Sequence, residues 1–134
     1  TQFASSAASD VYKRQILVRV SAKGPKGIEE AELILDTGAS QTIISKSVAN
    51  TIGCGAKERS GYKAITTAKG IIDAEAYRIH SFKSLGLIRQ NFEILVHDLH
   101  LAFSSLGIDG LLGLDFITKR RLTIDLREKH LLLS

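Results

Sequence analysis

From residue 15 onward the chain is a succession of short, β-prone apolar runs separated by turn residues, with no long stretch of helical period. Residues 16–21 and 28–35 are the first two runs, and residues 23–27 between them form a glycine- and proline-containing turn. The one proline lies in that turn, where its missing N–H removes no hydrogen bond from a strand ladder. A hairpin is therefore predicted here, and the pattern as a whole predicts an all-β fold.

The rest of the pattern predicts further strands and two short helices. A helix at 46–52 has signals at both ends, because Ser45 is a suitable N-cap and Gly53 a suitable left-handed residue after the last turn. Residues 62–68 and 71–82 predict a long hairpin with a glycine near its tip. The other expected elements are strands at 41–44, 91–97, 122–126 and 129–133 and a helix at 115–120.

Length and composition favour one soluble domain at residues 15–134, preceded by a disordered or non-native tail at residues 1–14. The 134 residues are 44% hydrophobic and 24% charged, close to the averages of globular proteins. No apolar run approaches the roughly 20 residues that cross a bilayer, and the first residues lack the pattern of a secretory signal. We therefore expect no membrane partner and a cytoplasmic location.

Charge and metal-ligand residues exclude several other classes of function. The net charge of +4 comes from scattered basic residues, and only 6% of the chain is aromatic, so no nucleic-acid partner is expected. A single cysteine, Cys54, has no second thiol for a disulfide or a zinc site. His97 and His100 have the spacing of a metal-binding pair but lack a third ligand. The sequence therefore predicts neither a metal nor another cofactor.

The segment most informative about function is an apolar strand that runs directly into an acidic turn. Residues 33–35 are apolar, and residues 36–40 read Asp-Thr-Gly-Ala-Ser. A carboxylate is rarely placed straight after a buried strand, because removing its charge from water is costly. A second segment of apolar residues and glycines, residues 110–114, follows roughly 70 residues later and ends at Asp115.

The two segments in this order resemble the signature of the retropepsin-like aspartic peptidases, which include retroviral proteases and single-domain cellular and bacterial relatives. The resemblance spans about residues 16–133 and implies a retropepsin-like acid protease barrel with one or two short helices, acting as a homodimer. It also implies that Asp36 is the catalytic residue of an endopeptidase. In such a site one carboxylate takes a proton from water while a second, protonated carboxyl polarises the peptide carbonyl. Because the sequence has one Asp-Thr-Gly and no Asp-Ser-Gly, the second acid is expected from Asp36 of another copy.

The same resemblance implies roles for the residues around the acid. Thr37 is expected to hydrogen-bond across the dimer axis, Gly38 to allow a close backbone approach, and Ser40 to brace the turn. The residues expected to support the loop are Thr37, Gly38, Ala39 and Ser40, and those expected to pack beneath it are Leu111, Leu112 and Gly113. A flap that closes over substrate is expected at Thr66, Thr67, Ala68, Lys69 and Gly70.

Alternatives remain open at this point. Viral members of the family commonly have an arginine where this chain has Leu114, so their salt-bridge network near the dimer contact is not expected here. The fold could also serve as a catalytically inactive, dimeric peptide-binding or scaffold module, and Asp36 alone could be a turn-capping aspartate. Asp109 is interpreted as a turn residue and Asp115 as a helix-start residue, so neither is assigned to catalysis. The expected partners are a second copy of the chain and a peptide or protein substrate.

Overall fold

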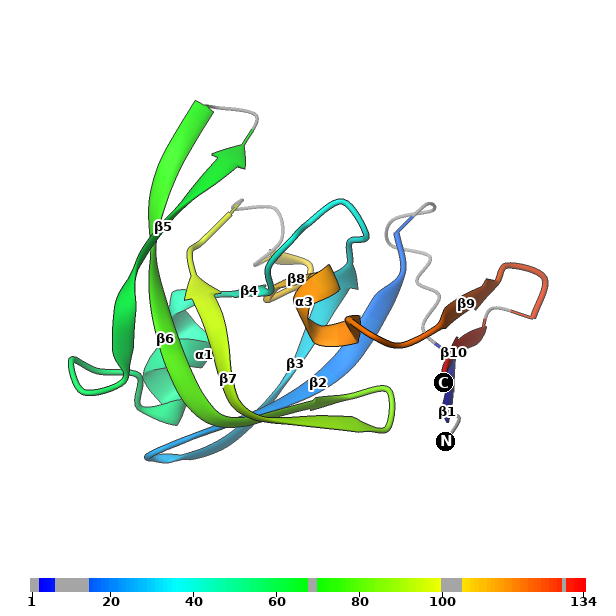
Figure 1. The fold of residues 1–134 in the computed structure, drawn as a ribbon, viewed down its shortest axis with the longest axis horizontal. Coiled ribbons are helices and arrows are strands. Elements are labelled where there is room, and N and C mark those ends of the chain that lie inside the picture. The colour runs from blue at the N-terminus through cyan, green and yellow to red at the C-terminus, as the bar shows by residue number, and fades with distance from the viewer. Residues whose placement is uncertain (1–2, 7–14, 68–69, 100–104, 129) are drawn as a thin grey trace.

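The computed structural model describes residues 3–6, 15–67, 70–99, 105–128 and 130–134, and its main body is a closed β-barrel (Figure 1). Antiparallel pairing of residues 20–23 with residues 81–84 closes a ring of six strands. In ring order they are β2 (Leu17–Gly24), β3 (Gly27–Leu35), β8 (Gly110–Leu112), β4 (Ile43–Ile44), β7 (Leu87–Val96) and β6 (Gly70–Ser84). The predicted all-β fold is confirmed.

The first hairpin, β2 and β3, forms as the alternation of its residues predicts. Every second residue of β2 is buried, including Val18, Val20 and Ala22, which is the pattern of a strand with one face on a core. The strand continues to Gly24, three residues beyond the predicted end, because this alternation continues. Gly24 pairs with Gly27, whose positive φ of 142° suits glycine at the turn.

A long hairpin stands out from the barrel at one end (Figure 1). It consists of β5 (Arg59–Thr67) and the first half of β6, paired from Arg59 opposite Tyr77 to Thr67 opposite Gly70 with one register shift between Arg59 and Gly61. The second half of β6 pairs instead with β7 and β2. The predicted hairpin is confirmed, although each strand is longer than expected.

The connection between β6 and β7 was missed by the sequence analysis, which started the next strand at residue 91. The two strands turn at Leu85 and Gly86, both with positive φ, of 53° and 76°. Such turns join antiparallel strands well, but leucine rarely adopts this conformation. Leu85 is buried in the core, so packing of its side chain offsets the unfavourable φ.

The core fills the barrel and extends under α1 (Lys46–Ile52). Both predicted ends of this helix are confirmed, since Ser45 Oγ accepts a hydrogen bond from Val48 N and Gly53 is left-handed at φ 89°. Val48 and Ile52 are buried against the barrel. At the other end of the core the rings of Phe82, Phe92 and Phe116 have centroids 5.3 to 5.9 Å apart.

The two ends of the described chain each differ from the prediction, and the first difference is near the C-terminus. The helix expected at 115–120 is α3 (Leu114–Ile117), and it ends earlier because Thr118 leaves the helical conformation at ψ 142°. Arg89 donates from Nε to Phe116 O and from Nη2 to Thr118 O at this end, both at 2.8 Å. Strands β9 (Leu122–Asp125) and β10 (His130–Leu133) then form a hairpin.

The second difference concerns the expected tail at residues 1–14. Four of these residues form β1 (Phe3–Ser6), which pairs antiparallel with β10 and makes a separate three-stranded sheet with β9. The tail was predicted because its sequence has no strand period, but a strand edge can recruit a segment through backbone hydrogen bonds alone. Within the described ranges, no helix has both the length and the apolar character that crossing a bilayer requires.

Candidate active site

The strand β3 delivers Asp36 into a tight turn, called here the Asp36 turn (residues 36–40). Asp36 N donates to Leu112 O at 3.0 Å, and Ala39 N donates to Asp36 O at 3.1 Å. The N–H of Gly38 points back at the carboxylate and donates to Asp36 Oδ1 at 2.9 Å. One carboxylate oxygen of Asp36 is thus held by a backbone N–H of its own turn.

The second glycine-containing segment lies directly beside this turn. Strand β8 inserts between β3 and β4, with Leu111 opposite both Ile34 and Ile43. Leu112 is fully buried, whereas Leu111 is partly exposed to the groove described below. Barrel closure therefore brings together two segments that the sequence separates.

Both glycines of this second segment permit close backbone contacts. A Cβ on Gly110 would lie 1.9 Å from Ile43 O, and Gly110 also has a positive φ of 147°. A Cβ on Gly113 would lie 2.6 Å from the carbonyl carbon of Gln41 and 3.0 Å from Ala39 O. Since these neighbours are backbone atoms, a side chain at Gly113 would displace the end of the Asp36 turn, and one at Gly110 would displace β4.

A hydrogen-bonded lock joins the two segments, and the sequence analysis did not predict it. The fully buried Thr42 donates from N to Asp115 Oδ2 at 3.0 Å and from Oγ1 to Asp115 Oδ1 at 2.8 Å. Its hydroxyl also accepts from Gly113 N at 3.1 Å, and Leu114 N donates to Ala39 O at 2.9 Å. We call Thr42, Asp115 and Gly113 the Thr42 lock. The one sequence signal of this lock was a threonine in the otherwise apolar strand predicted at 41–44.

The Thr42 lock lies two residues beyond the Asp36 turn and fixes the chain that follows it. Ser40 is exposed, and its bracing role stays a prediction. Asp115 lies in the first turn of α3, as predicted, but its carboxylate points at Thr42. Burial raises the pKa of Asp115, and the hydrogen bonds from Thr42 oppose that rise.

The other acid set aside in the sequence analysis, Asp109, lies outside the groove. Its backbone carbonyl accepts from Ser45 N at 2.8 Å, and its N–H donates to Glu32 O at 2.8 Å. Burial raises the pKa of Asp109, and the Ser45 hydroxyl opposes that rise. These contacts fit its interpretation as a turn residue before Gly110.

A groove of about 690 Å³ lies over the Asp36 turn. Asp36, Ser40 and Gln41 form part of one wall, and residues 64–66 of β5 line it from the long hairpin. The remaining apolar lining includes Ile34, Ile43, Leu95 and Leu111. An open cleft with an apolar floor and one carboxylate suits an extended peptide, whose side chains can be buried there.

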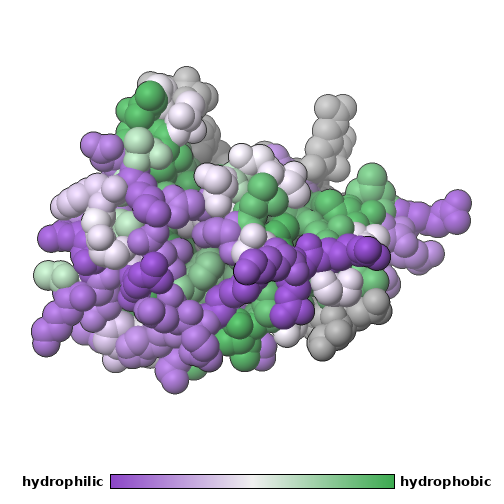
Figure 2. Space-filling model, viewed as in Figure 1, coloured by the Kyte–Doolittle hydropathy of each residue, from purple (hydrophilic) through white to green (hydrophobic). Residues whose placement is uncertain are grey.

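The structure brings some of the predicted flap residues to this groove. Thr66 lines it, and Gly70 begins β6 with a positive φ of 115°. The predicted flap residues Ala68 and Lys69 lie outside the described residues. Figure 2 shows apolar surface near the free end of this hairpin, where Ile71 is 75% exposed.

Metal ligands are not gathered near the groove. Among the described residues, no group of three or more His, Cys, Asp or Glu side chains could hold a metal ion. His97 Nδ1 is buried and has no hydrogen-bond partner among the residues that the structure describes, while His100, the second residue of the predicted pair, lies outside them. Cys54 is a half-buried free thiol that packs against the core.

Comparison with known proteins decides the family. The sequence model of a family described as Aspartyl protease matches residues 18–116, which contain both the Asp36 turn and the Thr42 lock. The chain belongs to this family. No curated protein gives a significant match.

The fold of this aspartyl protease family member is shared with a solved structure. The crystal structure of a retropepsin-like aspartic protease from Rickettsia conorii matches with a TM-score of 0.68 at 18% sequence identity. The match covers 98% of this chain and 98% of that chain. The predicted retropepsin-like fold is therefore confirmed.

Proposed function

We propose that this aspartyl protease family member is an active aspartic endopeptidase that hydrolyses peptide bonds as a homodimer. The observation that carries the proposal is the Asp36 carboxylate, held by Gly38 N at the side of a peptide-sized groove. The family match and the retropepsin-like fold support it. One acid is insufficient for the chemistry, so Asp36 of a second copy supplies the other.

In the proposed reaction, the two Asp36 carboxyls lie close together and share one proton, since two like charges at that distance cannot both ionise cheaply. The ionised carboxyl takes a proton from water, and the water oxygen attacks the peptide carbonyl carbon. The protonated carboxyl donates its proton to the carbonyl oxygen. The tetrahedral intermediate collapses and its C–N bond breaks as the carboxyl protonated by water gives that proton to the amide nitrogen. The other carboxylate takes a proton from a hydroxyl of the intermediate, which restores the shared proton of the dyad.

Two features of the protomer favour a second copy at this site. The printed sequence has one Asp-Thr-Gly, so the second acid is assigned to Asp36 of another copy. Thr37 is exposed at the outer side of the Asp36 turn, where its hydroxyl is accessible to the same residue of a two-fold-related copy. The proposed role of Thr37 is to join the two turns across that axis.

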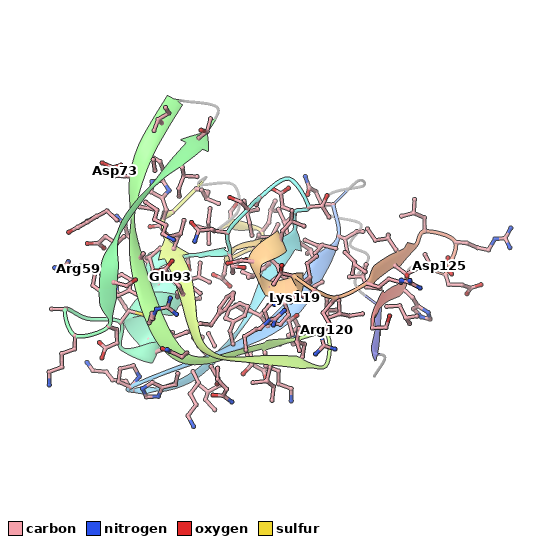
Figure 3. The ribbon with its side chains drawn as sticks, viewed as in Figure 1. Arg59, Asp73, Glu93, Lys119, Arg120 and Asp125 are labelled. Carbon is pink, nitrogen blue, oxygen red and sulfur yellow. The ribbon has the colours of Figure 1, made fainter. Side chains whose placement is uncertain are left out.

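The first test compares Asp36→Asn with the wild-type protein in cleavage of an apolar peptide library. We expect kcat/KM to fall by at least about a thousandfold, because the base is removed while the shape is kept. Asp125→Asn is the matched control: Asp125 lies on the β9–β10 hairpin (Figure 3), and asparagine keeps the oxygen that accepts from Arg127 N and Glu128 N. Cleavage that survives Asp36→Asn would rule out this mechanism.

A mixing experiment tests the shared dyad. When wild-type and Asp36→Asn protomers are mixed equally and exchange freely, a shared dyad leaves about one quarter of the wild-type activity, because only dimers of two wild-type copies are active. Protomers that act alone would leave about one half. Binding of a pepstatin-like inhibitor would support the enzyme, whereas wild-type protein that binds peptides but cleaves nothing would support the alternative, an inactive peptide-binding module.

A further inference from the structure

A single carboxylate connects the long hairpin to the segment that follows the Asp36 turn. Glu93, on β7, is within 2.6 Å of Lys63 Nζ and accepts from Ser60 Oγ at 2.8 Å, both on β5. Its Oε1 also accepts from Gln41 Nε2 at 3.4 Å. The Glu93 side chain is 18% exposed, against 45% for Lys63, so solvent weakens this ion pair less than a typical surface pair.

These side-chain contacts join β5 and β7, two strands that are not paired with each other by backbone hydrogen bonds in the described part of the chain. Strand β5 is the outermost strand of the seven-stranded sheet, and β6 separates it from β7. In the described part of the chain, β6 is the one strand that pairs with β5. Glu93 therefore links β5 to the barrel through side chains, near the base of the hairpin that carries Arg59 and Asp73 (Figure 3).

Glu93 itself does not line the groove, but it contacts Gln41 and Lys63, which lie in or next to its two walls. Gln41 lines the groove directly after the Asp36 turn, and Lys63 immediately precedes Ala64, which lines it from the hairpin. We propose that Glu93 is a positioning residue that fixes the hairpin against the Gln41 wall and so sets the groove to the width of its peptide. This inference rests on the proposed protease function, because it assigns the groove to a peptide substrate.

The charges around Glu93 keep this link formed at neutral pH. The hydrogen bond from Lys63 lowers the pKa of Glu93 most, with a smaller contribution from Ser60, and burial opposes both. The charged groups acting on it are Lys63 from β5 and Arg78 from β6, while its contact from Gln41 is neutral. Because the folded-state pKa is lowered, the link is fully formed above the ordinary glutamate range and is lost as the pH falls through the lowered value.

Hydrogen–deuterium exchange of the wild-type protein and Glu93→Gln tests the link without any need for activity. We expect the protection factors of the β5 amides, residues 60–66, to fall about fivefold at pH 7 in Glu93→Gln, while α1 is unchanged. Glu75→Gln is the matched control: it breaks an ion pair of Glu75 with Arg59 at 3.3 Å, which joins β5 to β6 alone. Unchanged protection in Glu93→Gln, or the same loss in Glu75→Gln, would overturn the inference.

If Glu93→Gln folds poorly, Lys63→Met provides a second test, because it removes the more exposed partner of the same ion pair. Lys63→Met should likewise lower the protection factors of residues 60–66. Acidification provides an independent readout. In the wild-type protein the protection of residues 60–66 should fall as Glu93 is protonated, whereas in Glu93→Gln it should be low throughout. A wild-type pH response that persists in Glu93→Gln would contradict the role of this carboxylate.

The kinetic arm separates this inference from the proposed function. With a peptide that the wild-type protein cleaves, Glu93→Gln should raise KM about fivefold and change kcat by less than about twofold, since the link positions substrate and does not touch the reacting atoms. A loss confined to kcat would overturn the positioning role. If the wild-type protein cleaves no peptide, the proposed function fails, and the exchange experiment still decides whether Glu93 fixes the hairpin.

Discussion

The substitution Thr42→Val isolates the Thr42 lock with little change in side-chain shape. Valine replaces the hydroxyl by a methyl group, so Gly113 N loses its acceptor and Asp115 Oδ1 loses its donor. The backbone hydrogen bond from residue 42 to Asp115 Oδ2 does not depend on the side chain. Any loss of stability therefore measures the Thr42 hydroxyl together with its two hydrogen-bond partners, Gly113 N and Asp115 Oδ1.

The expected cost follows from burial of these groups. Thr42 is 0% exposed, so water cannot replace the lost hydroxyl without a rearrangement. An unsatisfied buried N–H costs about 1–3 kcal/mol, and a lost hydrogen bond to a carboxylate is of similar size. The additional buried methyl returns up to about 1 kcal/mol. The free energy of unfolding should therefore fall by about 2–3 kcal/mol, a large part of the total for a domain of this size.

Urea unfolding followed by far-UV circular dichroism measures this loss, since the chain has no tryptophan. With a typical urea dependence, the midpoint should move down by about 1–2 M. Thr42→Ser keeps the hydroxyl and should recover most of the stability. Thr123→Val makes the same substitution on the exposed face of β9 and should change stability by less than about 0.5 kcal/mol. A loss in Thr42→Val no larger than in Thr123→Val would refute the lock.

Three further predictions follow from the described contacts. Gly113→Ala should lower the free energy of unfolding by at least about 2 kcal/mol in the same urea assay, because its Cβ would overlap backbone atoms. Gly55→Ala is the control: its Cβ would have its nearest contact at 3.6 Å, so the free energy of unfolding should fall by less than half as much. The folded state raises the pKa of Asp115, mainly through burial, so it binds that proton more tightly than the unfolded state does. The stability of the wild-type protein relative to Asp115→Asn should therefore decline as the pH rises from 3.8, and a difference that stays constant with pH would contradict this assignment. Burial, and secondly the charge of Glu58, raise the pKa of the Cys54 thiol from 9.0 to about 11. Alkylation by iodoacetamide at neutral pH should thus be about a hundredfold slower than for an ordinary thiol. A rate typical of an exposed cysteine would contradict the burial of the Cys54 thiol.

Local sequence signals were sufficient for several elements and for the position of the candidate acid. The cap at Ser45, the left-handed Gly53 and the alternation along β2 act within a few residues, so their outcome does not depend on the rest of the chain. The Asp36 turn belongs to the same group, because Gly38 N reaches the carboxylate two residues away. The family resemblance rested on this turn and on residues 110–115.

Other features depended on contacts that no short sequence pattern reports. The turn at Leu85 follows from the burial of its side chain, which overrides the poor preference of leucine for positive φ. Strand β1 exists because the edge of β10 accepts a partner through its backbone, with little regard to side-chain pattern. In both cases the stabilising contact, the core around Leu85 or the edge of β10, forms only when distant parts of the chain have come together.

The sequence by itself therefore determined the β-rich class, the β2–β3 and β5–β6 hairpins, the helix at 46–52 and the turn that presents Asp36. Tertiary structure alone decided what supports that acid and its groove: Thr42 meets Asp115 across 73 positions of the chain, and Gln41 meets Glu93 across 52. The physical reason is that hydrophobic period and turn chemistry are local, whereas barrel closure selects which distant polar groups are buried together and must satisfy one another.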